Sequence, residues 1–124
     1  MSSKRGKMDI QVKRVYEEAS PQDGARFLVD GLWPRGVSKR ALKGVEWVKE
    51  IAPSGDLRKW YGHDPEKWRE FQRRYRAELT KKGEAWKPLL AGVKKGAVTL
   101  LTATHDVDIS HAMVLRDFLR RKMR

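Results

Sequence analysis

The 124-residue sequence contains no cysteine, which excludes disulfide bonds, thiolate nucleophiles and cysteine-ligated zinc or iron–sulfur sites. Long apolar runs are also absent, because the segment 97–101 falls far short of the roughly 20 apolar residues that cross a membrane. The polar first residues lack the apolar centre of a signal peptide. We therefore expect a cytoplasmic protein without a membrane-spanning segment.

Acidic residues are scarce relative to basic ones, with 16 against 28 and a net charge of +12. Such an excess favours attraction to nucleic acids or other polyanions. Much of it lies near the two ends of the chain, where charged segments are usually solvated and attract phosphates without sequence preference. The charge is thus compatible with nucleic-acid binding but does not identify it. We predict a disordered basic tail at residues 1–8 and a single domain at residues 9–124.

The spacing of apolar residues predicts several strands. One strand is expected to start near Ile10, and another at residues 27–29 with the alternation of a half-buried strand. Residues 97–102 are apolar without alternation, which is typical of a central strand covered on both faces. Residues 45–51 fit a strand or a helix equally, with Trp47 pointing inward in both cases. The expected fold is α/β, a small, at least partly parallel sheet flanked by helices.

Capping signals and a 3.6-residue period predict helices between and after these strands. A short helix is expected at residues 57–61, with Ser54 as its N-cap and Gly62 directly after its end, and a longer helix is expected from Asp64 to Gly83. A third helix is expected at residues 84–95, interrupted near Pro88.

The long helix carries opposite charges four residues apart. Glu70 and Arg74 form one such pair, and Glu78 and Lys82 form another. Ion pairs at this spacing are expected on the exposed face of a helix.

The first candidate site is the segment 30–36, Asp-Gly-Leu-Trp-Pro-Arg-Gly, directly after a predicted strand. Ligand sites of α/β proteins lie in loops at strand ends. Trp33 offers a stacking face, and Arg35 can donate two hydrogen bonds to a carboxylate or phosphate. In the alternative interpretation, Trp33 fills the core and Asp30 pairs with Arg35 to fix a turn.

The second candidate site is the segment 105–111, between the central strand and the last helix. Its two histidines, His105 and His111, lie among carboxylates and can act in acid–base chemistry or bind an anion at the helix N-terminus. The spacing matches no established zinc or calcium pattern, and we predict no metal site. In the alternative interpretation, Ser110 or Asp108 only caps the helix.

The third candidate site is the junction at residues 57–64, which contains Arg58 and His63. Its aromatic residues Trp60 and Tyr61 are expected in the core. A direct ligand contact by Arg58 or His63 is therefore the weakest of the three site hypotheses.

Four segments in the same order, 29–36, 52–54, 57–65 and 75–79, strongly resemble the bacterial YeaO-like family, a catalogued domain of unknown function. The resemblance runs from about residue 12 to the last helix. It implies a compact α/β fold without an established activity, substrate or cofactor. His111 matches the usual histidine of the family, whereas relatives often have an alanine and a charged pair where this chain has Thr-His-Asp at 104–106.

Together these patterns predict that the first two candidate segments form one cleft for a small anionic molecule, such as a nucleotide, a phosphate or a carboxylate. Arg35 and the head of the last helix would hold the anion, and in an enzyme His111 would be the acid or base with Asp30 as its partner. The other predicted contacts come from Trp33, Arg58, His63, His105 and Ser110.

Two alternative functions remain open at this point. One is a nucleic-acid-associated basic protein that stacks bases on Trp33 or Trp60. The other is a non-catalytic interaction module. The sequence identifies neither a cofactor nor an oligomeric state.

Overall fold

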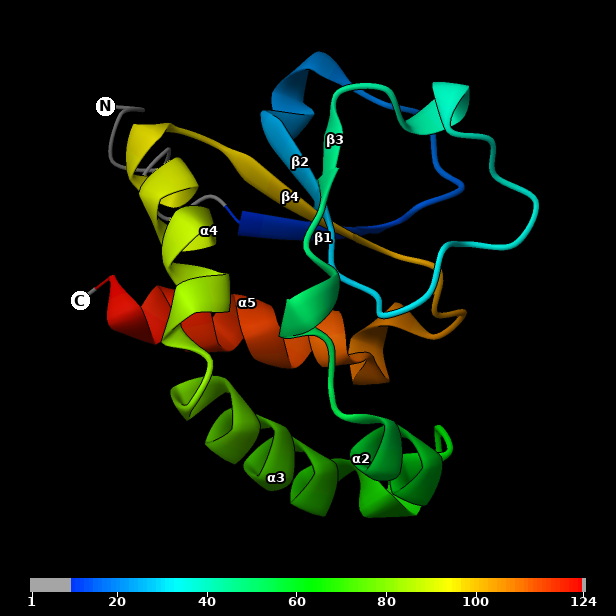
Figure 1. The fold of residues 1–124 in the computed structure, drawn as a ribbon, viewed down its shortest axis with the longest axis vertical. Coiled ribbons are helices and arrows are strands. Elements are labelled where there is room, and N and C mark those ends of the chain that lie inside the picture. The colour runs from blue at the N-terminus through cyan, green and yellow to red at the C-terminus, as the bar shows by residue number, and fades with distance from the viewer. Residues whose placement is uncertain (1–9, 124) are drawn as a thin grey trace.

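The computed structural model describes residues 10–123, which form a four-stranded sheet packed against helices (Figure 1). The strand order is β1-β4-β2-β3 and every neighbouring pair is parallel, so the expected α/β fold is confirmed. The predicted tail at residues 1–8 lies outside the described residues. The strands are β1 (Ile10–Arg14), β2 (Ala25–Leu28), β3 (Val45–Trp47) and β4 (Val98–Thr102).

Strand β4 lies between β1 and β2, and all five of its residues are buried. The prediction of a central strand covered on both faces is therefore confirmed. Strand β2 was expected to be half-buried, but Leu28 is as fully buried as its neighbour Val29. The reason is its position inside the sheet, where Phe27 faces the helices and Leu28 packs on the opposite face against Leu101.

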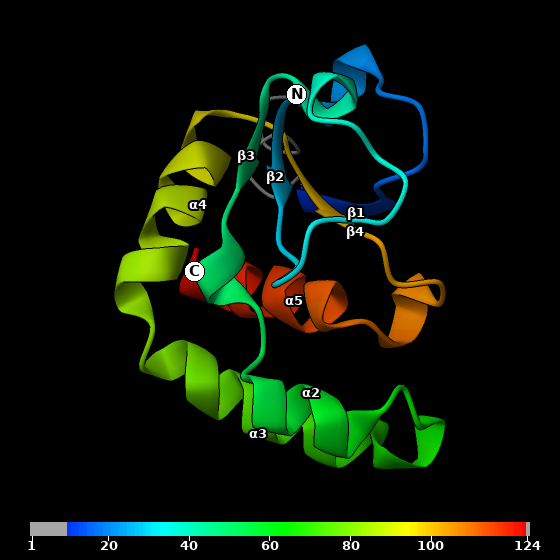
Figure 2. The same cartoon turned by 45° about the vertical axis from the view of Figure 1, so that its right-hand side comes forward.

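The α-helices lie in two layers on one side of the sheet (Figures 1 and 2). Helices α4 and α5 contact the sheet, whereas α2 and α3 pack beyond α5. The helices are α2 (Gly55–Tyr61), α3 (Trp68–Thr80), α4 (Gly83–Lys95) and α5 (His111–Lys122). The short 3-10 helices are η1 (Pro21–Asp23), η2 (Arg40–Leu42), η3 (Lys49–Ile51), η4 (Pro65–Lys67) and η5 (Val107–Ile109).

The opposite face of the sheet is covered by loops. A second, smaller core of Val15, Leu28, Leu42 and Leu101 lies there, with Trp33 packed against it. No α-helix within residues 10–123 contributes to this core, so the segments after β1 and β2 supply the apolar cover, with Leu42 coming from the short 3-10 helix η2.

Two predictions about α3 and α4 are wrong. Gly83 begins α4 instead of ending α3, because Trp86 of α4 donates a 2.8 Å hydrogen bond to the Leu79 carbonyl near the end of α3. Such a bond satisfies a terminal carbonyl without a glycine cap. Pro88 lies inside α4 without ending it, although an interior proline costs about 3 kcal/mol; the buried side chains of Trp86, Leu89 and Val93 pack the helix into the core on both sides of it.

One of the two predicted ion pairs on α3 forms. Glu70 contacts Arg74 at 2.8 Å. Glu78 instead accepts hydrogen bonds from the amide and hydroxyl of Ser54 at 2.8 and 2.6 Å, and Lys82 donates to the Ala52 carbonyl at 2.7 Å. Glu78 thus attaches α3 to the segment before α2, and Lys82 attaches the turn between α3 and α4 to the same segment.

Trp47 was expected to point inward, but 37% of it is exposed. Strand β3 lies at the edge of the sheet. Its Trp47 indole donates a 2.7 Å hydrogen bond to the Asp30 carbonyl and packs edge-on against Trp33 at 5.4 Å between ring centroids. The Trp47 side chain therefore stabilises the loop after β2.

Within residues 10–123, no helix has both the length and the apolar character needed to cross a membrane.

Candidate functional site

A cavity of about 400 Å³ lies where the C-terminal ends of β2 and β4 meet the head of α5 and the end of α2. Seven of the eight predicted site residues line it: Asp30, Trp33, Arg35, Arg58, His63, Ser110 and His111. The eighth, His105, is exposed and does not line the cavity. Parallel strands direct their C-terminal ends to one edge of the sheet, which is why segments distant in sequence meet here.

Asp30 and His111 face each other at the base of the cavity. His111 Nε2 lies 3.0 Å from the Val29 carbonyl oxygen and 3.2 Å from Asp30 Oδ1. Asp30 Oδ2 accepts a 2.8 Å hydrogen bond from the Ala103 amide. The imidazole is oriented for a hydrogen bond to the Val29 carbonyl and not to the carboxylate. Asp30 Oδ1 is therefore buried without a hydrogen-bond partner among residues 10–123.

Asp30 is ionised in this environment. Its burial by itself raises the pKa of the carboxyl group. The adjacent His111 imidazole and the Ala103 amide more than offset burial, and the pKa of Asp30 is lower than its usual value. The predicted Asp30–His111 partnership is thus present as a contact, whereas the alternative Asp30–Arg35 pair does not form.

The contacts of His111 fix the protonation of one ring nitrogen. A carbonyl oxygen only accepts hydrogen bonds, so Nε2 must carry the hydrogen that points to Val29. No residue in the described part of the chain hydrogen-bonds Nδ1, and Nδ1 is not among the buried atoms that lack a partner. Since His111 lines the cavity, its Nδ1 is the nitrogen available to a ligand.

The head of α5 faces the same cavity. Ser110 occupies the N-cap position, but its side chain caps no amide of the first turn. Its hydroxyl instead donates a 2.7 Å hydrogen bond to the Val107 carbonyl, so the prediction of a capping side chain at Ser110 is wrong. The positive end of a helix without such a cap favours a nearby negative charge.

Two exposed arginines stand beside the cavity, Arg35 after β2 and Arg58 on α2. Neither forms a salt bridge with a carboxylate of residues 10–123. Tyr16 donates a 3.0 Å hydrogen bond to the Arg35 carbonyl and so helps to fix the loop. Trp33 combines both interpretations of its role, because it packs against the second core and also lines the cavity.

His63 has a strained backbone. Its φ of 57° lies in the left-handed region, and it is the one residue other than glycine in residues 10–123 with a positive φ. The preceding Gly62, with φ 51°, ends α2 as predicted. Strain of this kind tends to persist where a side chain has a function.

The third candidate segment also contains the two aromatic residues expected in the core. Tyr61 is buried and donates a 2.8 Å hydrogen bond to the Ile109 carbonyl. Trp60 is only half-buried, and Arg74 and Lys67 lie over its ring at 4.2 and 5.1 Å. The Trp60 ring thus already contacts two cationic side chains of this chain.

Sequence reasoning missed Tyr16 and Thr104, which also line the cavity. Both lie two residues beyond the end of a strand, β1 and β4 respectively. The strand-end criterion that selected residues 30–36 would therefore have found them.

The cavity combines hydrogen-bond donors and positive charge with a single carboxylate that His111 already contacts. Arginine side chains and helix N-termini are typical anion ligands. Within residues 10–123 no group of three or more histidine, aspartate or glutamate residues is arranged to hold a metal ion.

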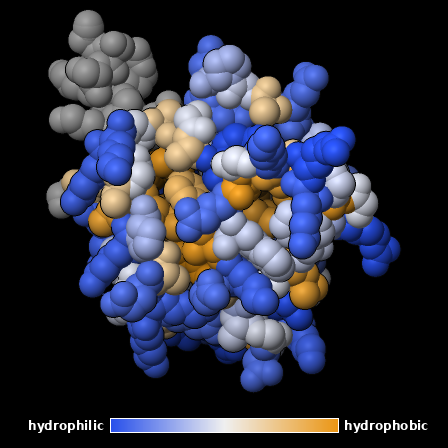
Figure 3. Space-filling view, turned by 45° about the horizontal axis from the view of Figure 1, so that its top comes forward, coloured by the Kyte–Doolittle hydropathy of each residue, from blue (hydrophilic) through white to orange (hydrophobic). Residues whose placement is uncertain are grey.

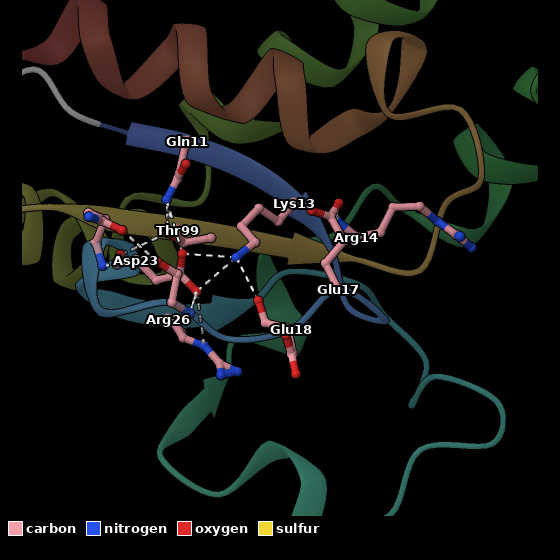
Figure 4. Close-up of polar contacts among 10 residues, drawn as sticks. Gln11, Lys13, Arg14, Glu17, Glu18, Asp23, Arg26 and Thr99 are labelled. Carbon is pink, nitrogen blue, oxygen red and sulfur yellow. Dashed lines mark hydrogen bonds and ion pairs between the residues drawn. The ribbon is translucent and has the colours of Figure 1, made fainter.

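A second polar centre lies on the loop-covered face of the sheet (Figure 4). Asp23 is only 2% exposed. Its carboxylate accepts hydrogen bonds from Lys13 at 3.0 and 3.1 Å, from Gln11 at 3.2 Å and from the Ser20 amide at 3.0 Å. Burial raises the pKa of Asp23, but Lys13 and Ser20 lower it to below its usual value.

Comparison with known proteins places the chain in a family. Residues 9–124 match the model described as "Inactive DUF488-N3 subclade". The chain is 44% identical to the uncharacterized protein YeaO of Escherichia coli over 113 residues, which cover 91% of this chain and 98% of YeaO. It is also 44% identical over 110 residues to the uncharacterized protein Rv3073c of Mycobacterium tuberculosis, covering 89% of this chain and 92% of that protein.

No solved structure matches the chain significantly. The family match spans residues 9–124 and so includes every residue of the cavity, and the two relatives match 91% and 89% of the chain. The chain therefore belongs to the YeaO-like family, in the subclade described as inactive DUF488-N3.

Proposed function

We propose that the protein binds a small anionic molecule, a nucleotide, a phosphate or a carboxylate, in the cavity at the strand ends. The observation that supports this proposal is the meeting of Arg35, Arg58 and the head of α5 around one cavity. These groups come from three separate parts of the chain. Neither arginine pairs with a carboxylate of residues 10–123, so both are free to bind an anion.

The proposal is for binding without turnover. The contact between Asp30 and His111 Nε2 leaves Nδ1 to exchange a proton with a ligand, which is the arrangement an acid–base catalyst uses. The description of the subclade as inactive favours a binding role for the same groups. His111 would then hold the anion as a hydrogen-bond donor when it is protonated.

The proposal is tested by isothermal titration with inorganic phosphate at low salt. We expect Arg35→Ala and Arg58→Ala each to weaken binding by about tenfold or more, because a hydrogen bond to a charged group contributes roughly 1.5–3 kcal/mol. Arg69→Ala is the matched control, since Arg69 is an exposed arginine that does not line the cavity. Equal affinities for all four proteins would refute the proposal.

A second candidate function is sequence-independent nucleic-acid binding. It is favoured by the net charge of +12 and by exposed basic residues on α3, α4 and α5. Their spread over three helices is typical of general attraction to phosphates. A salt titration of binding to a DNA duplex tests it, because such attraction is largely lost by roughly 200 mM salt. Retention of affinity for one sequence at that salt concentration would instead indicate a specific site.

The absence of cysteine from the chain also leads us to propose a cytoplasmic location.

A further inference from the structure

Exposed large hydrophobic side chains gather at the cavity. Residues 10–123 contain three of them: Tyr16, Leu32 and Trp47 are 49%, 68% and 37% exposed. Tyr16 and Leu32 line the cavity, and Trp47 packs against Trp33, which also lines it. In the view of Figure 3, hydrophilic side chains cover most of the surface and surround smaller hydrophobic areas.

Leu32 is held in place although it contributes little to the core. The backbone before it is fixed by the hydrogen bond from the Trp47 indole to the Asp30 carbonyl, at 2.7 Å. The backbone after it is fixed by the hydrogen bond from the Trp33 indole to the Val37 carbonyl, at 2.6 Å. The loop thus presents an apolar side chain to solvent in a defined position. Neither core needs Leu32 there, since it belongs to neither cluster.

The walls of the cavity are apolar and partly aromatic. Trp33, Tyr61 and Phe71 contribute ring surface, and Ala52 and Pro53 contribute aliphatic surface. An inorganic anion alone would leave this surface in contact with water. Pockets that bind organic ligands combine such walls with a few polar groups and have volumes of roughly 300–1,000 Å³. A volume of about 400 Å³ therefore fits a small organic molecule.

We infer that the ligand is an aromatic organic anion, an aryl phosphate or a nucleoside monophosphate, whose ring lies against Leu32 and Trp33. Its anionic group contacts Arg35, Arg58 and the head of α5. This inference rests on the proposed function, and it adds the chemical class of the ligand. It also assigns Leu32 a role in specificity, because its exposed side chain covers the ring.

The test compares the affinities of inorganic phosphate, phenyl phosphate and adenosine monophosphate, measured by isothermal titration with the full chain. At least one aromatic phosphate should bind about tenfold more tightly than inorganic phosphate, which corresponds to the burial of roughly 50 Å² of apolar surface. The adenosine monophosphate measurement distinguishes a nucleotide from a simple aryl anion.

Two substitutions at position 32 isolate the role of the side chain. Leu32→Ser should remove most of the preference for the aromatic phosphate and leave the affinity for inorganic phosphate unchanged. Leu32→Met should keep the preference, because methionine retains apolar contact area. Since Leu32 is 68% exposed, both variants should fold like the parent, which circular dichroism checks.

The outcomes separate the two proposals. Binding of inorganic phosphate without a preference for either aromatic phosphate would overturn this inference and leave the proposed function standing. A preference that survives Leu32→Ser would overturn the role of Leu32. If none of the three compounds binds, the proposed function fails for phosphates and nucleotides, and this inference fails with it.

Discussion

Asp23 and Asp30 are two aspartates of one small domain with little solvent exposure, and their carboxylates differ in how fully they are hydrogen-bonded. Both oxygens of Asp23 accept hydrogen bonds, and its own carbonyl accepts a 2.7 Å bond from Thr99. Asp30 Oδ1 has no hydrogen-bond partner among residues 10–123, and Asp30 lines a cavity. Burial favours the neutral form of each, yet neighbouring groups lower the pKa of both.

The difference indicates a structural role for Asp23, and it is consistent with the binding role that we propose for the cavity beside Asp30. A buried charge that is fully hydrogen-bonded fixes the elements around it and has no capacity left for a ligand. Asp23 connects β1, η1 and β4 in this way (Figure 4). An incompletely satisfied carboxylate is costly to bury, and such groups need an explanation. The cavity beside Asp30 supplies one.

The largest effect on stability is expected from removing the carboxylate of Asp23. Asp23→Ala leaves the Lys13 ammonium, which is 15% exposed, without its partner. Loss of one partner from a buried pair lowers the free energy of unfolding by about 3–5 kcal/mol. Asp30→Asn should cost only about 1–3 kcal/mol, because its amide oxygen can still accept the Ala103 hydrogen bond. Urea unfolding measures both, and a larger loss for Asp30→Asn would reverse our comparison.

The next largest effect tests how tightly each region is packed. A Cβ on Gly24 would lie 2.1 Å from the Ala97 carbonyl oxygen, at a φ of 66°. A Cβ on Gly31 would meet only the Ala52 Cβ, at 3.4 Å. We therefore expect Gly24→Ala to lower the free energy of unfolding by about 2–4 kcal/mol. Gly31→Ala is the matched control and should cost under about 1 kcal/mol, and similar losses for both would contradict this contrast.

Acid should destabilise the protein through both aspartates. Each has a native pKa below its usual value, so the unfolded chain binds protons first as the pH falls below about 4. The stabilising contribution is complete above that pH and is lost as the pH falls through the native pKa values. The urea concentration at the unfolding midpoint of the parent should therefore decrease as the pH is lowered from 5 to 2.5. The midpoint of Asp23→Asn should decrease less over the same pH range. An equal decrease in both proteins would show that Asp23 does not contribute to the acid destabilisation.

The smallest effect is expected at His63, and it has the opposite sign. The left-handed backbone costs a residue with a side chain about 1–2 kcal/mol, more than the roughly 0.5–1 kcal/mol of chain entropy that glycine adds. His63→Gly should therefore raise the free energy of unfolding slightly and weaken phosphate binding. His63→Asn is the control for the imidazole, because asparagine tolerates this backbone conformation. A less stable His63→Gly variant would show that His63 is structural.

Local signals in the sequence predicted much of the secondary structure. The Ser54 hydroxyl accepts the Leu57 amide at the start of α2, and Gly62 ends that helix. These signals succeed because capping involves residues that are neighbours in the chain. The errors at Gly83, Pro88 and Trp47 have another origin. Each depends on a partner or a sheet position that lies outside the local sequence.

The segment 30–36 and the segment 105–111 were both identified from the rule that ligands bind at strand ends. Residues of both segments line the cavity, but the rule did not distinguish His105 from His111. His105 falls in the bend after β4, whereas His111 opens α5. The path of the chain between residues 105 and 111 determines that the imidazole of His111, and not that of His105, contacts Asp30.

The sequence by itself determined the α/β class, the central position of β4, the family and the segments where a site was expected. Its local periodicity, caps and motifs are properties of adjacent residues, and they act before distant parts of the chain meet. Only the tertiary structure decided that His111 contacts Val29, 82 positions away, and that Asp30 keeps an unpartnered oxygen while Asp23 does not. The physical reason is that hydrogen-bond satisfaction depends on which groups the parallel sheet brings within about 3 Å of each other, and the strand order sets this.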